Sequence, residues 1–285
     1  MNPEKQDNDR MAYCVGCISL SGLTMTKVIL WLIAIAIVSF TIGFGILAVT
    51  GHFPPGSEQK ATPFKNTVLG SSNTTVFPLD GASSGEIRIL LGAGDLTLEG
   101  GAKDGRLMEA TVSSGLPEMQ PDYSVVMNGS VRSVAMTETG HKKKDWVMFH
   151  APESWANTWD VRLSDNVPVA LVINVGAGES VITLGTTNLT SLTVNNGAGE
   201  TTIDLTGYRG RQYDAKVHSG VGDLTMRIDR NSNTRIVMHN GVGDIDTRGI
   251  VQTDDHYTTP GFNPALPVNE ITITQGVGSI QLEAV

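Results

Sequence analysis

The sequence predicts an all-β protein, a β-solenoid-like ladder of stacked two-strand repeats that is preceded by one N-terminal transmembrane helix. Three observations lead to this class. A Gly-x-Gly-acid tetrapeptide recurs along the chain, apolar residues alternate on both sides of each copy, and one long uncharged apolar segment lies near the start. No amphipathic helix is evident in 86–285, so this part is expected to consist of strands and turns.

The first element is the apolar segment 28–49, which has 22 residues and no charge. At a rise of about 1.5 Å per residue this length crosses a hydrocarbon core of roughly 30 Å. A cleaved signal peptide is the alternative. It is disfavoured because its apolar run is usually about 7–15 residues and ends at a small-residue cleavage site, which is missing after Val49. We therefore expect an uncleaved, single-pass anchor in the cell membrane.

The positive charge at the start of the apolar segment favours a cytoplasmic N-terminus. Lys27 lies at this boundary, whereas Lys60 and Lys65 lie farther from the other end. Residues 1–27 then form a short cytoplasmic tail, and the β domain lies outside. Three Asn-x-Ser/Thr sequences fit this orientation and are candidate glycosylation sites. They are at Asn73, Asn128 and Asn188.

The charge and the cysteines limit the partners of the chain. The net charge is −9, and the acids and bases before residue 28 cancel, so the domain after the apolar segment is acidic. Such a domain disfavours nucleic acid and anionic lipid as partners. The two cysteines, Cys14 and Cys17, both precede the apolar segment. They are interpreted as free thiols or acylation sites, and no disulfide is expected in the folded part.

The rest of the chain divides into three expected parts. Residues 50–85 are rich in Gly, Pro, Ser, Thr and Asn and are predicted to form a linker. Residues 86–170 are predicted to form an N-terminal β lobe, because the motif is absent from most of them. Residues 171–285 form the predicted repeat domain, with a Pro-containing insertion near 251–267.

The repeat is about 21 residues long. From Gly176 onward its copies are spaced by 21, 23, 21 and 35 residues, and the insertion accounts for the last interval. Alternation on both sides of a Gly-x-Gly corner predicts two half-buried strands joined by a tight turn. Because one such unit cannot bury its own apolar face, the copies are expected to stack. An antiparallel sandwich of hairpins is the alternative. The motif begins at Gly92, Gly176, Gly197, Gly220, Gly241 and Gly276.

Several of these segments resemble a known family. The run from Trp159 to Glu179 contains a Trp, an alternating strand, a Pro and a Gly-Ala-Gly-acid turn, and 87–98 and 189–200 follow the same pattern. They resemble the toast-rack family of membrane and envelope proteins and, more distantly, the C-terminal domain of the cell-wall-active antibiotic response proteins (the LiaF-like group). The resemblance covers roughly 85–285. It implies a membrane-tethered strand ladder with a role in envelope stress sensing, and it supplies no catalytic residues.

Two sets of residues are candidate metal ligands. Stacked carboxylates can bind Ca²⁺, but the structural alternative is that each acid accepts backbone N–H bonds at its turn. His218 and His239 occupy equivalent repeat positions, so their rings could lie one strand spacing apart and bind a metal or respond to pH. The structural alternative is favoured, because two surface ladder residues have no third ligand beside them. The acidic set is Asp95, Glu179, Glu200, Asp223 and Asp244.

No sequence motif predicts an enzyme or a cofactor. No nucleophile elbow, zinc-protease motif or phosphate loop is present. The first functional hypothesis is a structural or interaction module of the cell envelope that contacts envelope proteins or wall polymers. The second is an envelope-stress, ion or ligand sensor that signals through the transmembrane helix. The oligomeric state does not follow from the sequence.

Overall fold

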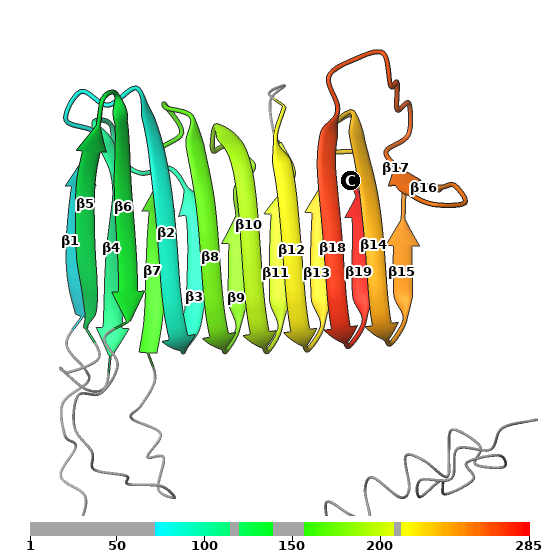
Figure 1. Cartoon of the computed structure of the whole chain (residues 1–285), viewed down its shortest axis with the longest axis horizontal. Helices are drawn as coiled ribbons and strands as arrows, with labels where there is room; N and C mark the ends of the chain where they lie inside the picture. The colour runs from blue at the N-terminus through cyan, green and yellow to red at the C-terminus, as the bar shows by residue number, and fades with distance from the viewer. Residues whose placement is uncertain (1–71, 115–119, 139–156, 208–211) are drawn as a thin grey trace, which may run out of the picture. The chain divides into compact units, whose positions relative to one another are not determined.

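The computed structural model describes residues 72–114, 120–138, 157–207 and 212–285. The regular elements in these residues are all β-strands, and they form two mixed sheets stacked face to face (Figure 1). The predicted all-β class is therefore confirmed. Within the same ranges no helix combines the length and apolarity needed to cross a bilayer. The predicted membrane helix at 28–49 and the tail at 1–27 lie outside the described residues.

Ten strands form the front sheet of Figure 1. In spatial order they are β16 (Val251–Gln252), β17 (Tyr257–Thr258), β14 (Thr234–Val242), β18 (Asn269–Val277), β12 (Asp214–Val221), β10 (Leu189–Ala198), β8 (Val169–Ala177), β2 (Ser84–Ala93), β6 (Val131–Glu138) and β5 (Pro121–Asn128). The strands from β14 to β6 are parallel, whereas β17 and β5 are antiparallel to their neighbours.

Nine strands form the back sheet. Their spatial order is β1 (Ser72–Pro78), β4 (Arg106–Ser114), β7 (Asn157–Leu163), β3 (Asp95–Gly100), β9 (Ser180–Thr183), β11 (Thr201–Leu205), β13 (Leu224–Ile228), β19 (Ile280–Ala284) and β15 (Ile245–Arg248). Here β1 and β4 are antiparallel to their neighbours, and the strands from β7 to β15 are parallel.

Each Gly-x-Gly sequence joins one front strand to one back strand, and we call such a pair a coil. The coils are β2/β3, β8/β9, β10/β11, β12/β13, β14/β15 and β18/β19. Equivalent residues face each other in neighbouring coils, for example Val194 and Val217 in the front sheet and Ile203 and Met226 in the back sheet. The two-strand repeat is thus present as predicted, and its copies stack in parallel.

The coils do not stack in the order in which they occur along the chain. The last coil, β18/β19, lies between β12/β13 and β14/β15. At the other end β6 and β7 follow β2/β3 in the sequence but stack outside it. Stacking in sequence order therefore holds for the four coils from β2/β3 to β12/β13 and fails for the last two coils.

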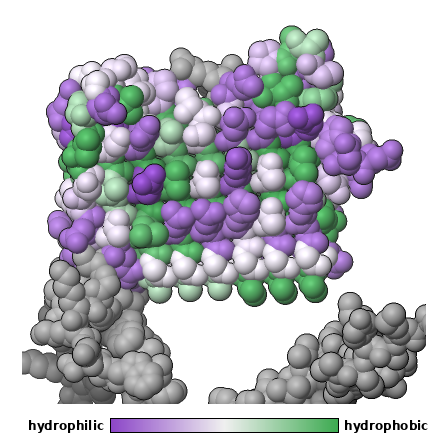
Figure 2. All heavy atoms as spheres, in the orientation of Figure 1, coloured by the Kyte–Doolittle hydropathy of each residue, from purple (hydrophilic) through white to green (hydrophobic). Residues whose placement is uncertain are grey.

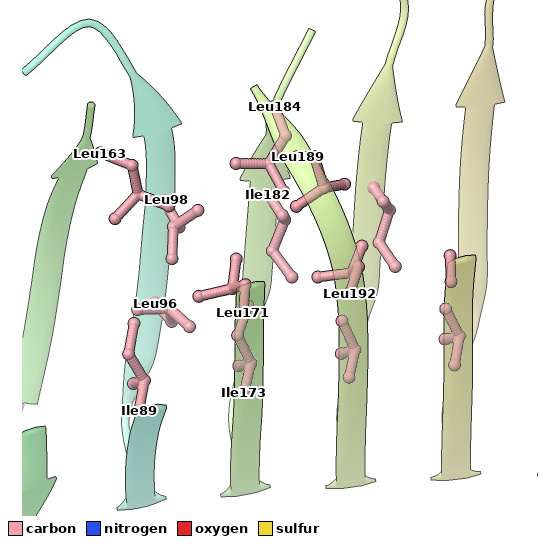
Figure 3. Packing of buried hydrophobic residues seen from close by; sticks show 14 of the residues in the cluster. Ile89, Leu96, Leu98, Leu163, Leu171, Ile173, Ile182, Leu184, Leu189 and Leu192 are labelled. Carbon is pink, nitrogen blue, oxygen red and sulfur yellow. The ribbon is translucent and has the colours of Figure 1, made fainter. Parts of the chain in front are cut away.

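The core lies between the two sheets because alternate residues of every central strand point inward. Leu171 and Ile173 from the front sheet meet Ile182 and Leu184 from the back sheet, and all four are fully buried (Figure 3). Burying one such side chain contributes about 1.5–3 kcal/mol. The period-2 pattern of the sequence therefore determines which face of each strand is apolar.

Two expected boundaries need correction. Strand β1 at 72–78 pairs with β4, so the predicted linker does not extend to residue 85. The lobe predicted at 86–170 is not separate, because its strands extend the same two sheets. The sequence pattern does not reveal this, because no Gly-x-Gly sequence lies between β6 and β7. The insertion near 251–267 contains β16 and β17.

Candidate functional site

The glycine corners require glycine for two physical reasons. The second glycine of each corner has φ between 128° and 144°, which L side chains rarely adopt. A Cβ at Gly199 would also lie 2.0 Å from the carbonyl oxygen of Gly178, and one at Gly197 would lie 2.4 Å from that of Gly176. Neighbouring coils therefore approach backbone to backbone, and the corners form one continuous rim.

The acidic residues lie on the back-sheet side of this rim. The backbone N–H of Glu179 donates to Asp95 Oδ1 at 3.2 Å, and that of Ser279 donates to Asp223 Oδ1 at 2.8 Å. Ser279 lies between Asp223 and Asp244, because β19 lies between β13 and β15. In the described part of the chain no three His, Cys, Asp or Glu side chains gather closely enough to hold a metal ion.

The two histidines are not neighbours. His218 of β12 and His239 of β14 both pair with Thr274 of β18, which separates them. The expected spacing of one strand is therefore wrong, and two spacings amount to about 9.6 Å between backbones. The error follows directly from the reversed order of the last two coils.

The structure places His218 in a shallow trough on the outer face of the front sheet, which we call the glycine trough, and His239 is not among the residues that line it. Its volume is about 590 Å³. The first glycines of five corners form its floor, namely Gly92, Gly176, Gly197, Gly220 and Gly276. A row of outward side chains forms its wall, namely Leu90, Asn174, Asn195, His218 and Thr274. Figure 2 shows such rows of similar hydropathy crossing the strands above a rim of pale and apolar residues.

The wall of the trough is a ladder of hydrogen-bonding groups. Asn195 Nδ2 donates to Asn174 Oδ1 at 2.8 Å, so the two amides support each other across β8 and β10. His218 and Thr274 continue the row with an imidazole and a hydroxyl. The rim on the other side carries the exposed side chains of Val221 and Val277. Four of the five wall side chains are thus polar, whereas the surface that the trough exposes is mainly apolar.

Buried polar residues fix the corners from the inside, and sequence reasoning missed them. Asn196 Nδ2 donates to the carbonyl of Gly199 at 3.2 Å and to Thr201 Oγ1 at 2.7 Å. Gln275 Nε2 donates to the carbonyls of Gly222 and Val277. The sequence signal for these residues is a polar residue directly before the first glycine of a corner.

The three candidate glycosylation sites differ in exposure. Asn73 on β1 and Asn128 at the turn between β5 and β6 are exposed, whereas Asn188 is half-buried in the loop before β10. Glycosylation of any of them stays a prediction.

A parallel ladder of glycine-cornered coils with an open surface trough is the class of protein that this fold defines. The family model described as the N-terminal domain of toast_rack, DUF2154, matches residues 65–227. The chain belongs to this family, as its sequence pattern indicated. No curated protein matches the chain.

Solved structures that are similar to the chain include two adhesion-type proteins. A provisionally assigned cell-adhesion protein from Clostridium sporogenes is 19% identical with a TM-score of 0.67, over 75% of this chain and 99% of that one. At this identity the likeness shows the fold alone. A provisionally assigned adhesin from Bacteroides fragilis is 10% identical with a TM-score of 0.29, over 74% of this chain and 97% of that one.

Proposed function

We propose that the chain is a single-pass membrane protein that displays its β ladder outside the cytoplasm as a non-enzymatic binding module of the cell envelope. The observation that carries this proposal is the glycine trough, which crosses five strands on an open face of the front sheet. Its lining presents amides, a hydroxyl and an imidazole, and His218 is its sole titratable residue. Such a lining suits binding and positioning, whereas hydrolysis needs a nucleophile with a base.

The partner that best fits the trough is a neutral wall polysaccharide. The wall repeats a hydrogen-bonding side chain at four neighbouring strands, from β8 to β18, about every 4.8 Å. A polymer with similar residues can meet such a wall repeatedly, and each contact adds to the affinity. The net charge of −9 disfavours polyanionic polymers. The provisional adhesion role of the Clostridium protein, which shares the fold, is in keeping with a surface module.

Membrane anchoring rests on the uncharged segment 28–49. It is tested by replacing both native cysteines with serine and introducing Thr274→Cys in the trough. A membrane-impermeant maleimide should label this cysteine in intact cells. Labelling that requires permeabilised cells would place the domain on the cytoplasmic side and overturn the orientation.

Binding is tested by co-sedimentation of the detergent-solubilised full chain with insoluble neutral wall glycan. The variant Thr274→Trp fills the trough and should weaken binding about fivefold or more. Thr272→Trp is the matched control, because Thr272 lies on the same face of β18 one pleat away from the trough. Equal binding by wild type and Thr274→Trp, or equal loss in both variants, would overturn the assignment of the trough.

The sensor alternative has a separate readout. A rise in the melting temperature of the full chain in millimolar Ca²⁺ or Zn²⁺ would favour an ion sensor over a glycan-binding module. We expect no rise, because the carboxylates of Asp95 and Asp223 already accept backbone N–H groups.

A further inference from the structure

The ladder is incompletely closed at the β14/β15 end. In β15, Ile245 occupies the ladder position of Ile280 in β19, and the two residues are paired. Ile280 is fully buried, but Ile245 is 37% exposed. The inner face of this last coil therefore lacks the neighbour that covers the same face of the other coils.

The insertion covers only part of this end. Strand β17 pairs with β14 at Arg235 and Ile236, and Tyr257 packs against the core there. Beyond this point, towards the corner, β14 continues to Val242 as the outermost strand of the front sheet in the described ranges. Strand β15 is likewise the last strand of the back sheet. Both strands present unpaired backbone groups, which can bind another β-strand.

We propose that a second copy of this chain binds the β14/β15 end through a two-fold axis, with β14 antiparallel to β14 of the other copy and β15 antiparallel to its own counterpart. Each sheet would then continue across the dimer. Asn240 lies two residues before the corner end of β14, and Thr247 lies two residues after the start of β15. One axis can therefore pass near both residues.

The charges of β15 fit this arrangement. With Thr247 opposite Thr247 of the second copy, Asp246 lies opposite Arg248 of the second copy, and the reverse pair also forms. Within one copy Arg248 Nη2 is 3.9 Å from Asp246 Oδ2, and Arg248 Nη1 is 3.3 Å from Glu283 Oε1. A strand that reads acid-x-base is self-complementary when paired antiparallel, which favours a second copy over an unrelated strand.

The insertion does not block this pairing. When Asn240 lies on the axis, β14 of the second copy ends opposite residues near 238 of the first copy. Strand β17 pairs farther along, at Arg235 and Ile236, so the two do not compete for the same part of β14. The other end of the ladder is closed differently, because Phe77 and Tyr123 bring their rings to 5.1 Å between the last strands of the two sheets. The geometry therefore points to one particular end.

The first test is cross-linking by cysteine. In a full chain with both native cysteines replaced by serine, Thr247→Cys should give a disulfide-linked dimer under mild oxidation, because opposed residues of antiparallel strands are about 4.5–5.5 Å apart at Cα. Val126→Cys on the outermost strand β5 is the control and should stay monomeric. A dimer through Val126→Cys with none through Thr247→Cys would overturn the proposal.

The second test removes the complementarity without touching the core. Asp246→Arg brings two arginines together and should raise the dimer dissociation constant by about tenfold or more, as measured by light scattering over a dilution series. Its melting temperature at monomeric concentration should equal that of wild type. A wild-type chain that is monomeric at every concentration, or a dimer that tolerates Asp246→Arg, would refute the proposed interface. The trough lies on the outer face of the sheet, so this outcome does not depend on glycan binding.

Discussion

The two ends of the ladder are finished in different ways. At the β1/β5 end antiparallel strands flank the last parallel strands, Phe77 is buried against Tyr123, and Arg132 forms an ion pair with Asp80. At the β14/β15 end the last strands are parallel members of an ordinary coil, and only a short hairpin covers half of it. Antiparallel strands can thus close a parallel ladder, whereas a coil that simply comes last leaves its inner face partly open.

A coil with neighbours on both sides is buried more completely than the coil at the β14/β15 end. Leu224 and Met226 in β13 have coils on each side and are fully buried. The matching residues of β15 have one neighbour and remain partly accessible. Stability should therefore be concentrated in the middle coils, and substitutions at matched positions can measure the difference.

The largest effect is expected at a corner in the middle of the ladder. Gly199→Ala forces a side chain onto a φ of 128° and places Cβ 2.0 Å from a backbone oxygen. We expect a loss of about 4 kcal/mol or more in the free energy of unfolding. Gly101→Ala is the control, since φ is 87° but no atom lies within 4 Å, and it should lose only about 1 kcal/mol. Similar losses in urea denaturation would contradict the steric account.

The next effect compares a middle residue with its partner at the open end. Ile280→Ala leaves a cavity in a fully enclosed position and should lower the free energy of unfolding by about 3 kcal/mol. Ile245→Ala, on the neighbouring strand at the same ladder position, should lower it by less than about 1 kcal/mol when measured on the monomer. Equal losses of stability in the two variants would mean that the β14/β15 end is packed as tightly as the middle of the ladder.

A smaller effect is expected at the closed end. Glu138 Oε2 accepts the backbone N–H groups of Gly92 at 2.5 Å and Ala93 at 3.2 Å. Glu138→Gln keeps the shape but removes the charge, so thermal denaturation should show a loss of about 1 kcal/mol. Glu99→Gln is the control, because Glu99 and Arg162 form an exposed pair with 3.8 Å between their charged atoms, and it should change stability little. A larger loss of stability for Glu99→Gln than for Glu138→Gln would contradict the stabilising role assigned to the hydrogen bonds of Glu138.

The smallest effect concerns pH at the same end. The backbone N–H of Lys103, which donates to Glu109 Oε1 at 2.8 Å, and then the nearby Arg106 lower the pKa of Glu109 below its ordinary value of 4.5. A lowered folded-state pKa stabilises the protein above the unfolded value, and this contribution is lost as the pH falls through the folded value. Glu109→Gln should therefore have a slightly lower melting temperature than wild type at neutral pH, and this difference should shrink as the pH falls below the ordinary value of 4.5. A difference in melting temperature that persists at low pH would show that the ionised Glu109 carboxylate is not its cause.

Much of the fold follows from the sequence, because period-2 alternation and the glycine corner are local signals. They identify the buried side of β8 to β13 and explain why residues such as Ile203 and Val217 face the core. The order in which the coils stack is not determined by a local signal. Coils β14/β15 and β18/β19 carry nearly the same corner sequence, so either could pair with β12/β13. Tertiary packing and the length of the insertion decide between them.

The candidate site was harder to predict for the same reason. The trough depends on which outward side chains lie next to each other across strands, and that depends on the order of the coils. The acids were visible in the sequence, and two of them, Asp95 and Asp223, have the backbone-accepting role that was one of the two interpretations. The row of buried amides behind the corners was missed because a polar residue before glycine reads equally well as an ordinary turn signal.

The reversed order of the coils also constrains how the chain can reach its final state. Strand β14 is complete in the sequence before β18 begins, yet β18 lies between it and β12. A ladder that grew coil by coil as the chain emerged would pair β14 with β12 and would have to release it later. Final assembly must therefore await residues 269–284, which form β18 and β19, and this makes completion a late, long-range event that is vulnerable to mispairing.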